Sequence, residues 1–442
     1  MNTSTISGTG ASSSTSAEHL RKSKRATFVA VLGTFIEYYD FSIYGYVAAT
    51  LAQVFFPKSN PTASLLDTLA VFGLAFLIRP IGAWFFGRLG DVRGRRTSLI
   101  ASIVLMGLAS TITGFLPGYA LIGVMAPVLL VLMRLLQGFS TGGEIGGAAS
   151  YIREWAPPHR RALYIAFIPS VAQLGKGLAA GIAALMAAML TPADLLEWGW
   201  RVPYILALPL ALLTIWLRLS VEDSPEFVVL ASEQKPLKSP MQEIFSNYPK
   251  QLMKVITISM VQNIGTYLGT VFVAVYFSEV LQFTKSQATT IVLCAVLFAS
   301  VLIPFAGLLG TKIGGKKTLL IAYALYAVVS VPEFMLMNQK SLTLALVGLL
   351  IGIIPYALCQ AGTYSSMPEL FPTRVRHSGV AFGHSLGAVI GGGGGPYFAT
   401  WLIGATGDKL MPSYLLAGAG LIGLVVVGLT VKSNPNGSHT YR

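Results

Sequence analysis

The sequence predicts an all-α membrane protein with twelve transmembrane helices in two six-helix, pseudo-symmetric halves. Its composition is 54% hydrophobic and only 11% charged, with a mean hydropathy of +0.66. Its apolar residues form long uninterrupted runs, and two stretches of the first half recur in the second. A soluble globule carries about a quarter charged residues, and a transmembrane β-barrel shows short segments of alternating polarity. Neither pattern is present here.

Each apolar run is long enough to cross a bilayer as a helix, which takes about 20 residues. The runs cover residues 27–55, 64–86, 97–116, 121–151, 161–190, 201–219, 253–280, 287–310, 317–337, 341–367, 376–404 and 411–431. Some of the runs are longer than a span requires, which indicates tilted or protruding helices. Helices are expected throughout, because lipid offers no hydrogen-bonding partner to an open sheet edge.

Polar segments divide these spans into domains. Residues 1–26 begin with a Ser/Thr/Gly-rich stretch, and we expect a disordered cytoplasmic N-terminus rather than a signal peptide. The polar segment 220–252 is expected to be a cytoplasmic linker. It joins six-helix bundles at 27–219 and 253–431, and residues 432–442 form a cytoplasmic tail.

The distribution of Lys and Arg predicts the orientation, because these residues stay on the cytoplasmic side of membrane proteins. With both termini inside, the exceptions on the outer side are Lys58, Arg201, Lys285, Lys340 and Lys409, and those within spans are Arg79, Arg134 and Lys176. Topology and anionic lipid headgroups therefore explain the net charge of +13. Nucleic acid is not expected as a partner.

Two stretches of the first half recur in the second at nearly the same offset. "GRLGDVRGRRTSL" begins at Gly87 and "GLLGTKIGGKKTL" at Gly307, while "REWAPPHRRA" begins at Arg153 and "PELFPTRVRH" at Pro368. Such parallel repeats are typical of secondary transporters, whose substrate site lies near the bilayer midplane between the halves.

The first copy predicts a latch at the cytoplasmic end. Asp91 is expected to pair with a base or a helix N-terminus on a neighbouring segment. The other residues expected at this gate are Arg88, Arg95, Arg96, Glu144, Arg153, Glu154, Arg161, Glu369 and Arg376. Glu144 is expected to link to Arg88 or Arg153. Exposed ion pairs are individually weak, at or below about 1 kcal/mol, which suits a gate that breaks in each cycle. Alternatively, the bases only enforce orientation.

"GRLGDVRGRRTSL" resembles the loop signature of the major facilitator superfamily. The second copy has Thr311 where an acid is usual, so we expect an asymmetric latch. "EYYDFSIYGY", "FLIRPIGAWFFGRLGD", "RLLQGFSTGGEIGGAASYIRE", "EWGWRVPY" and "PELFPTRVRHSG" together resemble the metabolite:proton symporter family over nearly the whole chain. The resemblance implies transport of an organic acid, or of a zwitterion such as proline or betaine, across a bacterial inner membrane.

Glu37 and Asp40 are two carboxylates inside the first span, where ionised side chains mark functional sites. They lie about 15–20 Å from its cytoplasmic end at about 1.5 Å per residue. Three residues apart, they share a helix face, and we expect them to titrate as a coupled unit with Asp40 as the proton carrier. The resemblance implies Arg134, in a similar "RxxQG" stretch, as their counter-charge. A purely structural ion pair is the alternative.

Other polar residues within the spans are candidates for binding substrate. They are Tyr44, Lys176, Gln262, Asn263, Tyr267, Tyr356, Gln360 and His384. Lys176 either binds a substrate carboxylate or neutralises Glu37. For the others, hydrogen bonds that pack helices are an equal alternative. Arg79 is interpreted as a structural base of the second span.

The motifs of other function classes are missing from the sequence. "GGGGGP", from Gly391, lacks the GxxxxGK[ST] pattern of a phosphate loop and predicts close packing or bending of a helix. Metalloprotease and hydrolase motifs are absent, and Cys294 and Cys359 are read as buried hydrophobes. We therefore predict a non-enzymatic transporter without a cofactor or metal, functional as a monomer and driven by the proton gradient.

The main prediction is symport of a small organic acid, such as a di- or tricarboxylate, with protons by alternating access. One alternative is a zwitterion such as proline or betaine, for which Tyr38, Tyr39, Tyr44 and Tyr267 offer cation–π contacts. A second alternative is proton-driven drug export.

Overall fold

The computed structural model describes residues 9–56, 68, 71, 73–233, 239–393 and 395–431. Within these residues every regular element is a helix, and the helices follow the order of the twelve predicted spans. The first bundle contains α1 (Thr9–Phe55), α3 (Arg79–Arg93), α4 (Arg95–Phe115), α6 (Met125–Trp155), α7 (Arg161–Met189) and α9 (Val202–Leu219), with the short helices α5 (Tyr119–Ile122) and α8 (Pro192–Glu197).

The second bundle repeats this order. It contains α12 (Pro249–Thr266), which continues through η3 (Tyr267–Phe272), α13 (Val273–Val275) and η4 (Tyr276–Val280), then α14 (Lys285–Ile313), α15 (Gly315–Met337), α16 (Leu342–Ser366), α17 (Arg376–Ala388) with η7 (Val389–Gly393) and α18 (Gly395–Thr406), and α19 (Met411–Thr430). Among the described residues, nine helices are long and apolar enough to cross a membrane. The remaining spans correspond to α1, α3 and the divided pair α17 and α18.

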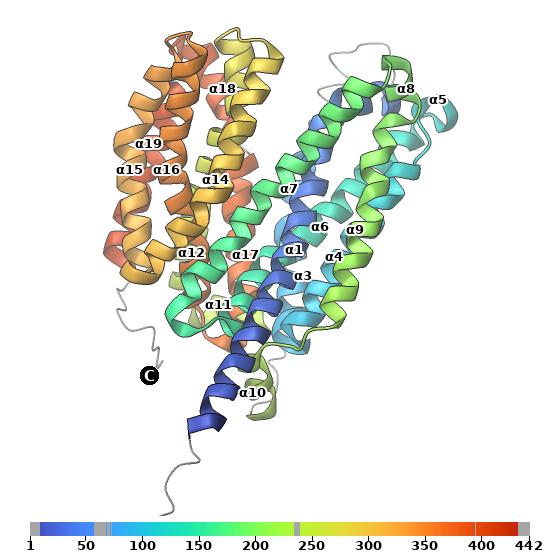
Figure 1. Cartoon of the computed structure of the whole chain (residues 1–442). Coiled ribbons are helices and arrows are strands. Elements are labelled where there is room, and N and C mark those ends of the chain that lie inside the picture. Colours follow the sequence, from blue (N-terminus) through green and yellow to red (C-terminus); the bar gives the residue numbers. More distant parts are fainter. Residues whose placement is uncertain are drawn as a thin grey trace, which may run out of the picture.

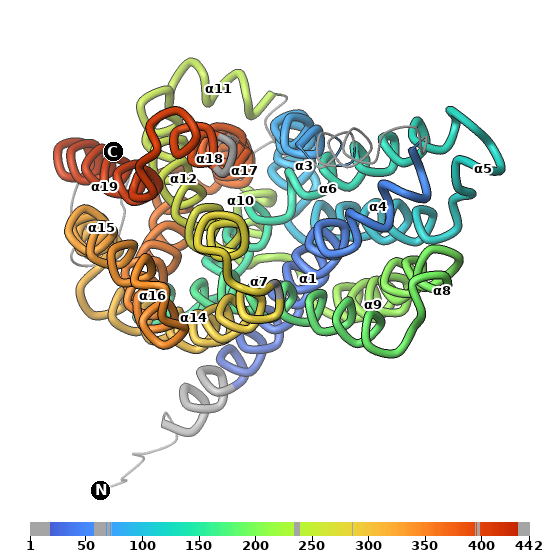
Figure 2. Tube along the Cα trace, turned by 90° about the horizontal axis from the view of Figure 1, so that it is seen from above, coloured from blue at the N-terminus to red at the C-terminus, as the bar shows by residue number. Residues whose placement is uncertain are grey.

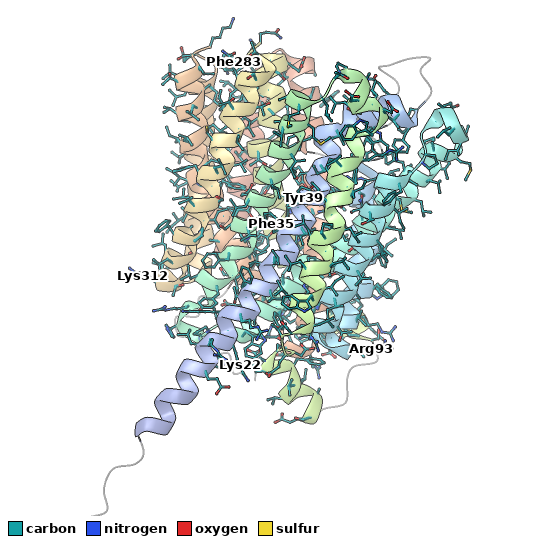
Figure 3. The ribbon with its side chains drawn as sticks, turned by 45° about the vertical axis from the view of Figure 1, so that its right-hand side comes forward. Lys22, Phe35, Tyr39, Arg93, Phe283 and Lys312 are labelled. Atoms are coloured by element: carbon teal, nitrogen blue, oxygen red, sulfur yellow. The ribbon has the colours of Figure 1, made fainter. Side chains whose placement is uncertain are left out.

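The two bundles stand side by side (Figure 1, Figure 2). Their ribbons diverge toward the end where α8 and α18 are labelled and converge toward the end where α10 (Pro225–Glu233) and α11 (Pro240–Asn247) lie (Figure 1). Lys22, Arg93 and Lys312 lie at this second end, opposite Phe283 (Figure 3). We call it the basic end.

The structure corrects three predicted boundaries. The N-terminal segment 1–26 was expected to be disordered, yet α1 is helical from Thr9, because extending an existing helix is cheap and Glu18 pairs with Lys22 one turn away at 3.7 Å. Residues 1–8 and 432–442 lie outside the described residues. The linker 220–252 contains α10 and α11, and α12 already begins at Pro249.

The third correction concerns the "GRLGDVR" stretch, which is the last part of α3 rather than a loop. α3 ends only at Gly94, where φ is 105°, and α14 ends at Gly314, where φ is 87°. These two glycines occupy matching positions of the repeat. Both adopt backbone angles that disfavour any side chain, so the repeat conserves a helix-ending turn.

Glycine also sets how closely helices pack. A Cβ added at Gly138 or Gly142 of α6 would overlap the backbone of Ala75 or Arg79, which brings Arg79 against α6. The predicted close packing at "GGGGGP" is confirmed, because a Cβ at Gly391 would overlap the backbone of Met260 in α12. Small residues are what allow transmembrane helices this close an approach.

Replacing Gly142 by alanine tests the packing of α3 on α6. The added methyl group has to displace the backbone at Arg79, so we expect a loss of about 1–3 kcal/mol in stability. A lower midpoint of thermal unfolding in detergent would report it. The matched control is Gly181→Ala in α7, where a Cβ meets nothing within 4 Å. Equal midpoints for the two variants would contradict the packing argument.

Candidate functional site

α1 carries the two predicted acids through the middle of the first bundle. Phe35 and Tyr39 mark this level in Figure 3. Glu37 is 2% exposed and Asp40 is 1% exposed. Oε2 of Glu37 and Oδ2 of Asp40 find no hydrogen-bond partner among the described residues. Two buried carboxylates with spare acceptors are costly unless they take up protons or bind donors.

Asp40 is connected to Arg134 by a relay of side chains. The Asp40 carboxylate lies within hydrogen-bonding reach of the Ser110 side chain. The Ser110 hydroxyl accepts from Nε2 of Gln137 at 2.9 Å, and Oε1 of Gln137 accepts from Nη1 of Arg134 at 2.7 Å. The Arg134 charge also acts directly on Asp40. The expected counter-charge therefore lies near Asp40, with two intermediates that we did not predict.

Arg134 is fully buried and lies over aromatic rings. Its guanidinium carbon is 4.0 Å from the ring centre of Tyr44 and 4.9 Å from that of Phe41. The Tyr44 hydroxyl donates to the carbonyl oxygen of Thr68 at 3.0 Å. Tyr44, a predicted substrate contact, therefore supports the arginine, and cation–π contact offsets part of the cost of burying it.

Glu37 has charged neighbours that Asp40 does not share, and the charge of Asp40 acts on it as well. The charges of Glu144, Arg79 and Arg218 act on Glu37 more strongly than that of Asp40. Two side chains that are three residues apart on an α-helix point in directions that differ by about 60°. Because α1 is surrounded by other helices, this difference points the two acids at different partners. Lys176 is not among the bases that act most on Glu37.

Glu144 pairs with Arg218 of α9, and not with Arg88 or Arg153 as expected. Oε2 of Glu144 also accepts from Ser102 at 2.8 Å. A Cβ at Gly33 of α1 would overlap both members of the pair, so the pair lies directly against α1, one turn below Glu37. Sequence reasoning missed Arg218 because it stands at the end of a span, where a base normally only sets orientation.

Arg79 is a central residue and not only a base of the second span. Its guanidinium carbon lies 4.5 Å from the ring centre of Phe41 and 4.3 Å from that of Phe76. It reaches the hydroxyl of Tyr267, which belongs to the second bundle. The Phe76 and Tyr267 rings meet edge to face at 5.4 Å. The two bundles therefore touch around Arg79.

Other predicted substrate contacts lie on both sides of this junction. Nζ of Lys176 lies 5.4 Å from the ring centre of Tyr38. One helical turn away, Nε2 of Gln173 donates to the hydroxyl of Tyr356 across the bundles at 2.5 Å. The His384 ring lies 5.9 Å from that of Tyr364. Gln173 was missed, although it precedes Lys176 by three residues and shares its face.

The predicted amides of the second bundle hydrogen-bond to one another. Gln262 donates to Oε1 of Gln360 at 2.9 Å, and both donate to the hydroxyl of Thr266. Asn263 donates to Oε1 of Gln262 at 2.8 Å and to the carbonyl of Ser259. These bonds satisfy many of the hydrogen-bond donors and acceptors of the three amides, as expected if the amides pack helices together.

At the basic end, Asp91 holds the start of a helix from the other bundle. Its Oδ1 pairs with Nη1 of Arg95 at 2.7 Å and accepts from the backbone N–H of His377 at 3.2 Å. Its Oδ2 accepts from the N–H of Ser378 at 2.9 Å. These N–H groups begin α17, where a negative charge is favoured. Asp91 thus contacts both a base and a helix N-terminus, the two kinds of partner that we expected.

Glycines permit this contact. A Cβ at Gly90 would overlap the ring of His377, and a Cβ at Gly87 would overlap the backbone of Ser378. The "GRLGD" spacing therefore places two glycines and the acid on the face of α3 that meets α17.

Two acids form ion pairs with most of the arginines of the predicted gate. Glu154 of α6 pairs with Arg95 at 3.3 Å and with Arg376 at 2.7 Å. Glu226 of α10 pairs with Arg376 at 2.6 Å and with Arg153 and Arg161, each at 3.4 Å. Arg95 also donates to the carbonyl of Thr373 at 2.5 Å. Sequence reasoning missed Glu226, because it treated the linker as a passive connection.

The remaining predicted gate residues lie outside these ion pairs. Arg96 donates to the backbone carbonyls of Arg218 and Leu219, and the charge of Glu369 acts on Arg153. Arg88 is exposed and forms no ion pair within the described part of the chain. Asp223 accepts from the N–H groups that begin α4. Burial raises the pKa of the Asp223 carboxyl above its ordinary value, and these hydrogen bonds oppose the shift.

Within the described ranges, no group of three or more His, Cys, Asp or Glu side chains could hold a metal ion.

Comparisons with known proteins agree with this architecture. A family model described as the Major Facilitator Superfamily matches residues 30–396 and 270–440. The chain is 31% identical over 424 residues to the "Proline/betaine transporter" of Escherichia coli K12, covering 94% of the chain and 84% of that protein. It is 33% identical over 422 residues to the "Glycine betaine/proline/ectoine/pipecolic acid transporter OusA" of Dickeya dadantii, covering 93% and 84%.

Two further comparisons concern function and fold. The chain is 35% identical over 398 residues to the "Inner membrane metabolite transport protein YhjE" of Escherichia coli K12, covering 89% of the chain and 90% of that protein. Among solved structures, the proton:xylose symporter XylE has a TM-score of 0.80 at 17% identity, covering 94% of this chain and 97% of that one. This likeness supports the twelve-helix fold.

Replacing Glu154 by glutamine tests the gate. Arg95 and Arg376 each lose one of two carboxylate partners and keep the other, which is Asp91 for Arg95 and Glu226 for Arg376. Removing one member of a buried ion pair is destabilising, so the closed basic end becomes less stable. Spin labels at Arg93 and Lys312, with both native cysteines replaced, should then report longer or broader distances by pulsed electron resonance.

The control for this change is Glu222→Gln, because the Glu222 side chain is 71% exposed and its one ion pair within the described residues is with Lys22. If the label-to-label distances in Glu154→Gln match those in the parent, Glu154 does not help to close the gate.

Proposed function

The chain belongs to the major facilitator superfamily and is a secondary transporter, not an enzyme, and we propose that it imports a small zwitterion such as proline or betaine together with protons. The observation that carries the proposal is the substrate named for its relatives, which share 31% and 33% identity over nearly the whole chain. This reverses the order of the predictions from sequence, where an organic acid came first.

Asp40 is the proton carrier in this proposal. Ionised, Asp40 attracts Arg134 and holds the relay through Ser110 and Gln137. Protonation removes the charge that orders this relay, so α1, α4 and α6 can shift relative to one another. A group that releases its partner on protonation couples a proton to a conformational change.

The gate gives this cycle a direction. We assign the basic end to the cytoplasm of a bacterial cell, since Lys and Arg remain on that side, with the protein in the inner membrane and both termini inside. The contacts of Asp91, Glu154 and Glu226 hold this end closed, so substrate and proton enter from the outside. Rocking of the two bundles then exposes them to the cytoplasm. The proton gradient drives a monomer, and no cofactor takes part.

An organic acid is the second candidate substrate. Its support is the presence of two bases within the predicted spans, Arg79 and Lys176, which could together hold two carboxylates. The relative YhjE is named only as a metabolite transport protein. The same assay therefore has to include both classes of substrate.

Uptake into proteoliposomes tests the function. With an imposed inward proton gradient, we expect accumulation of labelled proline or betaine above its external concentration. Collapse of the gradient with a protonophore should abolish it, and empty liposomes are the control. Accumulation of di- or tricarboxylates alone would establish the second candidate. Accumulation of any substrate regardless of the gradient would refute proton coupling.

Substitution of the two acids tests which of them carries the proton. We expect Asp40→Asn to lose gradient-driven accumulation while it retains substrate exchange, because a neutral side chain can still permit the conformational change. Glu37→Gln is the matched variant on the same helix and should keep gradient-driven accumulation. The opposite result would transfer the role of carrier to Glu37.

A further inference from the structure

Arg79 is a buried cation that forms no ion pair among the described residues, and the charge of Glu37 acts on it from beyond contact distance. Its side chain is 6% exposed, its Nε has no hydrogen-bond partner among the described residues, and no carboxylate of the described chain lies within 4 Å of its guanidinium. A buried charge is normally paired and hydrogen-bonded. Arg95, Arg153, Arg218 and Arg376, which are the buried arginines with ion pairs among the described residues, all follow this rule.

Aromatic rings, and no carboxylate of the described residues, contact the Arg79 guanidinium. The guanidinium lies over the rings of Phe41 and Phe76, which meet edge to face at 5.2 Å. It also reaches the Tyr267 hydroxyl. Two further tyrosines, Tyr38 and Tyr364, lie within hydrogen-bonding reach of each other across the bundles. The cluster is therefore rich in ring faces, and both bundles contribute to it.

This arrangement lies where alternating access needs a substrate. Phe41 belongs to α1 and Arg79 to α3 of the first bundle, while Tyr267 begins η3 in the second. The Phe76–Tyr267 contact joins the bundles at this level. A ligand that binds here touches both bundles, and it can therefore influence how they move against each other.

We propose that Arg79 binds the carboxylate of the substrate and that the rings of Phe41, Phe76 and Tyr267 bind its ammonium group. The inference rests on the proposed function and assigns its substrate site. A guanidinium matches a carboxylate with two parallel hydrogen bonds, and a quaternary ammonium prefers aromatic faces. A zwitterion with the two charges one carbon apart meets both requirements.

The same geometry predicts an exchange of cations. In the absence of substrate, the guanidinium covers ring faces that a substrate ammonium would use. On binding, the carboxylate draws the guanidinium toward itself and the ammonium takes the vacated face. Arg79 thus acts as an internal substitute for the substrate cation, and its removal should affect anionic and cationic ligands in opposite directions.

Three probes of similar size separate these contributions. Betaine carries both charges, choline carries only the ammonium, and 3,3-dimethylbutyrate has the shape of betaine with carbon in place of nitrogen. Binding is measured calorimetrically with the full-length protein in lipid nanodiscs. Arg79→Gln should weaken betaine and 3,3-dimethylbutyrate by about tenfold or more, as expected for a lost bidentate contact, and should leave choline unchanged or bind it more tightly.

Two further variants complete the test. Arg79→Lys keeps the charge but loses the planar fork, so it should weaken betaine less than Arg79→Gln does. Phe76→Leu should weaken betaine and choline and spare 3,3-dimethylbutyrate. The matched control is Arg88→Gln, which removes an exposed arginine of α3, the helix that carries Arg79. This variant should bind all three probes like the parent.

Several outcomes would overturn the assignment. If Arg79→Gln binds betaine like the parent, Arg79 does not belong to the site. If both Arg79 variants weaken the binding of all three probes equally, the role of Arg79 is structural. If the parent binds betaine and Phe76→Leu weakens only the binding of 3,3-dimethylbutyrate, the Phe76 ring does not bind the ammonium group, and the proposed roles of ring and guanidinium are wrong. If the parent binds neither betaine nor proline, the proposed substrate class itself fails, and the site assignment fails with it.

Discussion

The contact between Asp91 and the start of α17 is the constraint on which the rest of this structure depends. A carboxylate on α3 accepts two backbone N–H groups from the other bundle and is held in place by Arg95. Buried charge-assisted bonds of this kind are roughly twice as strong as neutral ones. They persist only while every partner stays in place, because a buried charge that loses its partner is destabilising by several kcal/mol. The basic end is therefore either closed with all partners satisfied or open with water in their place.

The same requirement recurs at two deeper levels along one face of α4. Arg95, Ser102 and Ser110 are seven and eight residues apart, so each lies about two turns beyond the last on the same side of the helix. They meet Glu154, Glu144 and Asp40 in turn. α4 therefore connects the gate, the pair beside Gly33 and the proposed proton carrier within one rigid element. A shift of α4 that follows protonation of Asp40 would disturb all three levels together, which gives the proposed coupling a physical route.

Sequence patterns predicted much of this arrangement, and the failures have physical causes. Apolar run length and the internal repeat were sufficient for the helices and for the pairing of the two halves, because the bilayer permits few alternatives. The latch was predictable from Asp91, since a carboxylate at a helix end needs donors. Arg218 and Glu226 were not, because their partners in α6, α7 and α17 are distant in sequence and any base or acid near a membrane surface has an ordinary explanation. Glu37 and Asp40 were grouped by spacing alone. Spacing describes one helix, whereas their partners are set by the helices packed around it.

The asymmetry expected from Thr311 follows from comparing the two copies of the repeat. Gly307 of α14 approaches Ala162 and Ala166 near the start of α7, much as Gly87 and Gly90 of α3 approach α17. Thr311, however, hydrogen-bonds to the carbonyl of Gly307 in its own helix at 3.0 Å, and it supplies no charge to α7. This side is held by neutral contacts such as Ser170 to Ser300 at 2.6 Å. Neutral packing can slide without exposing a buried charge, whereas the side of Asp91 has to break charged bonds. The two interfaces between the bundles therefore differ in kind. In the proposed cycle, the interface of α7 with α14 acts as the hinge, and the interface of α3 with α17 is the one that opens.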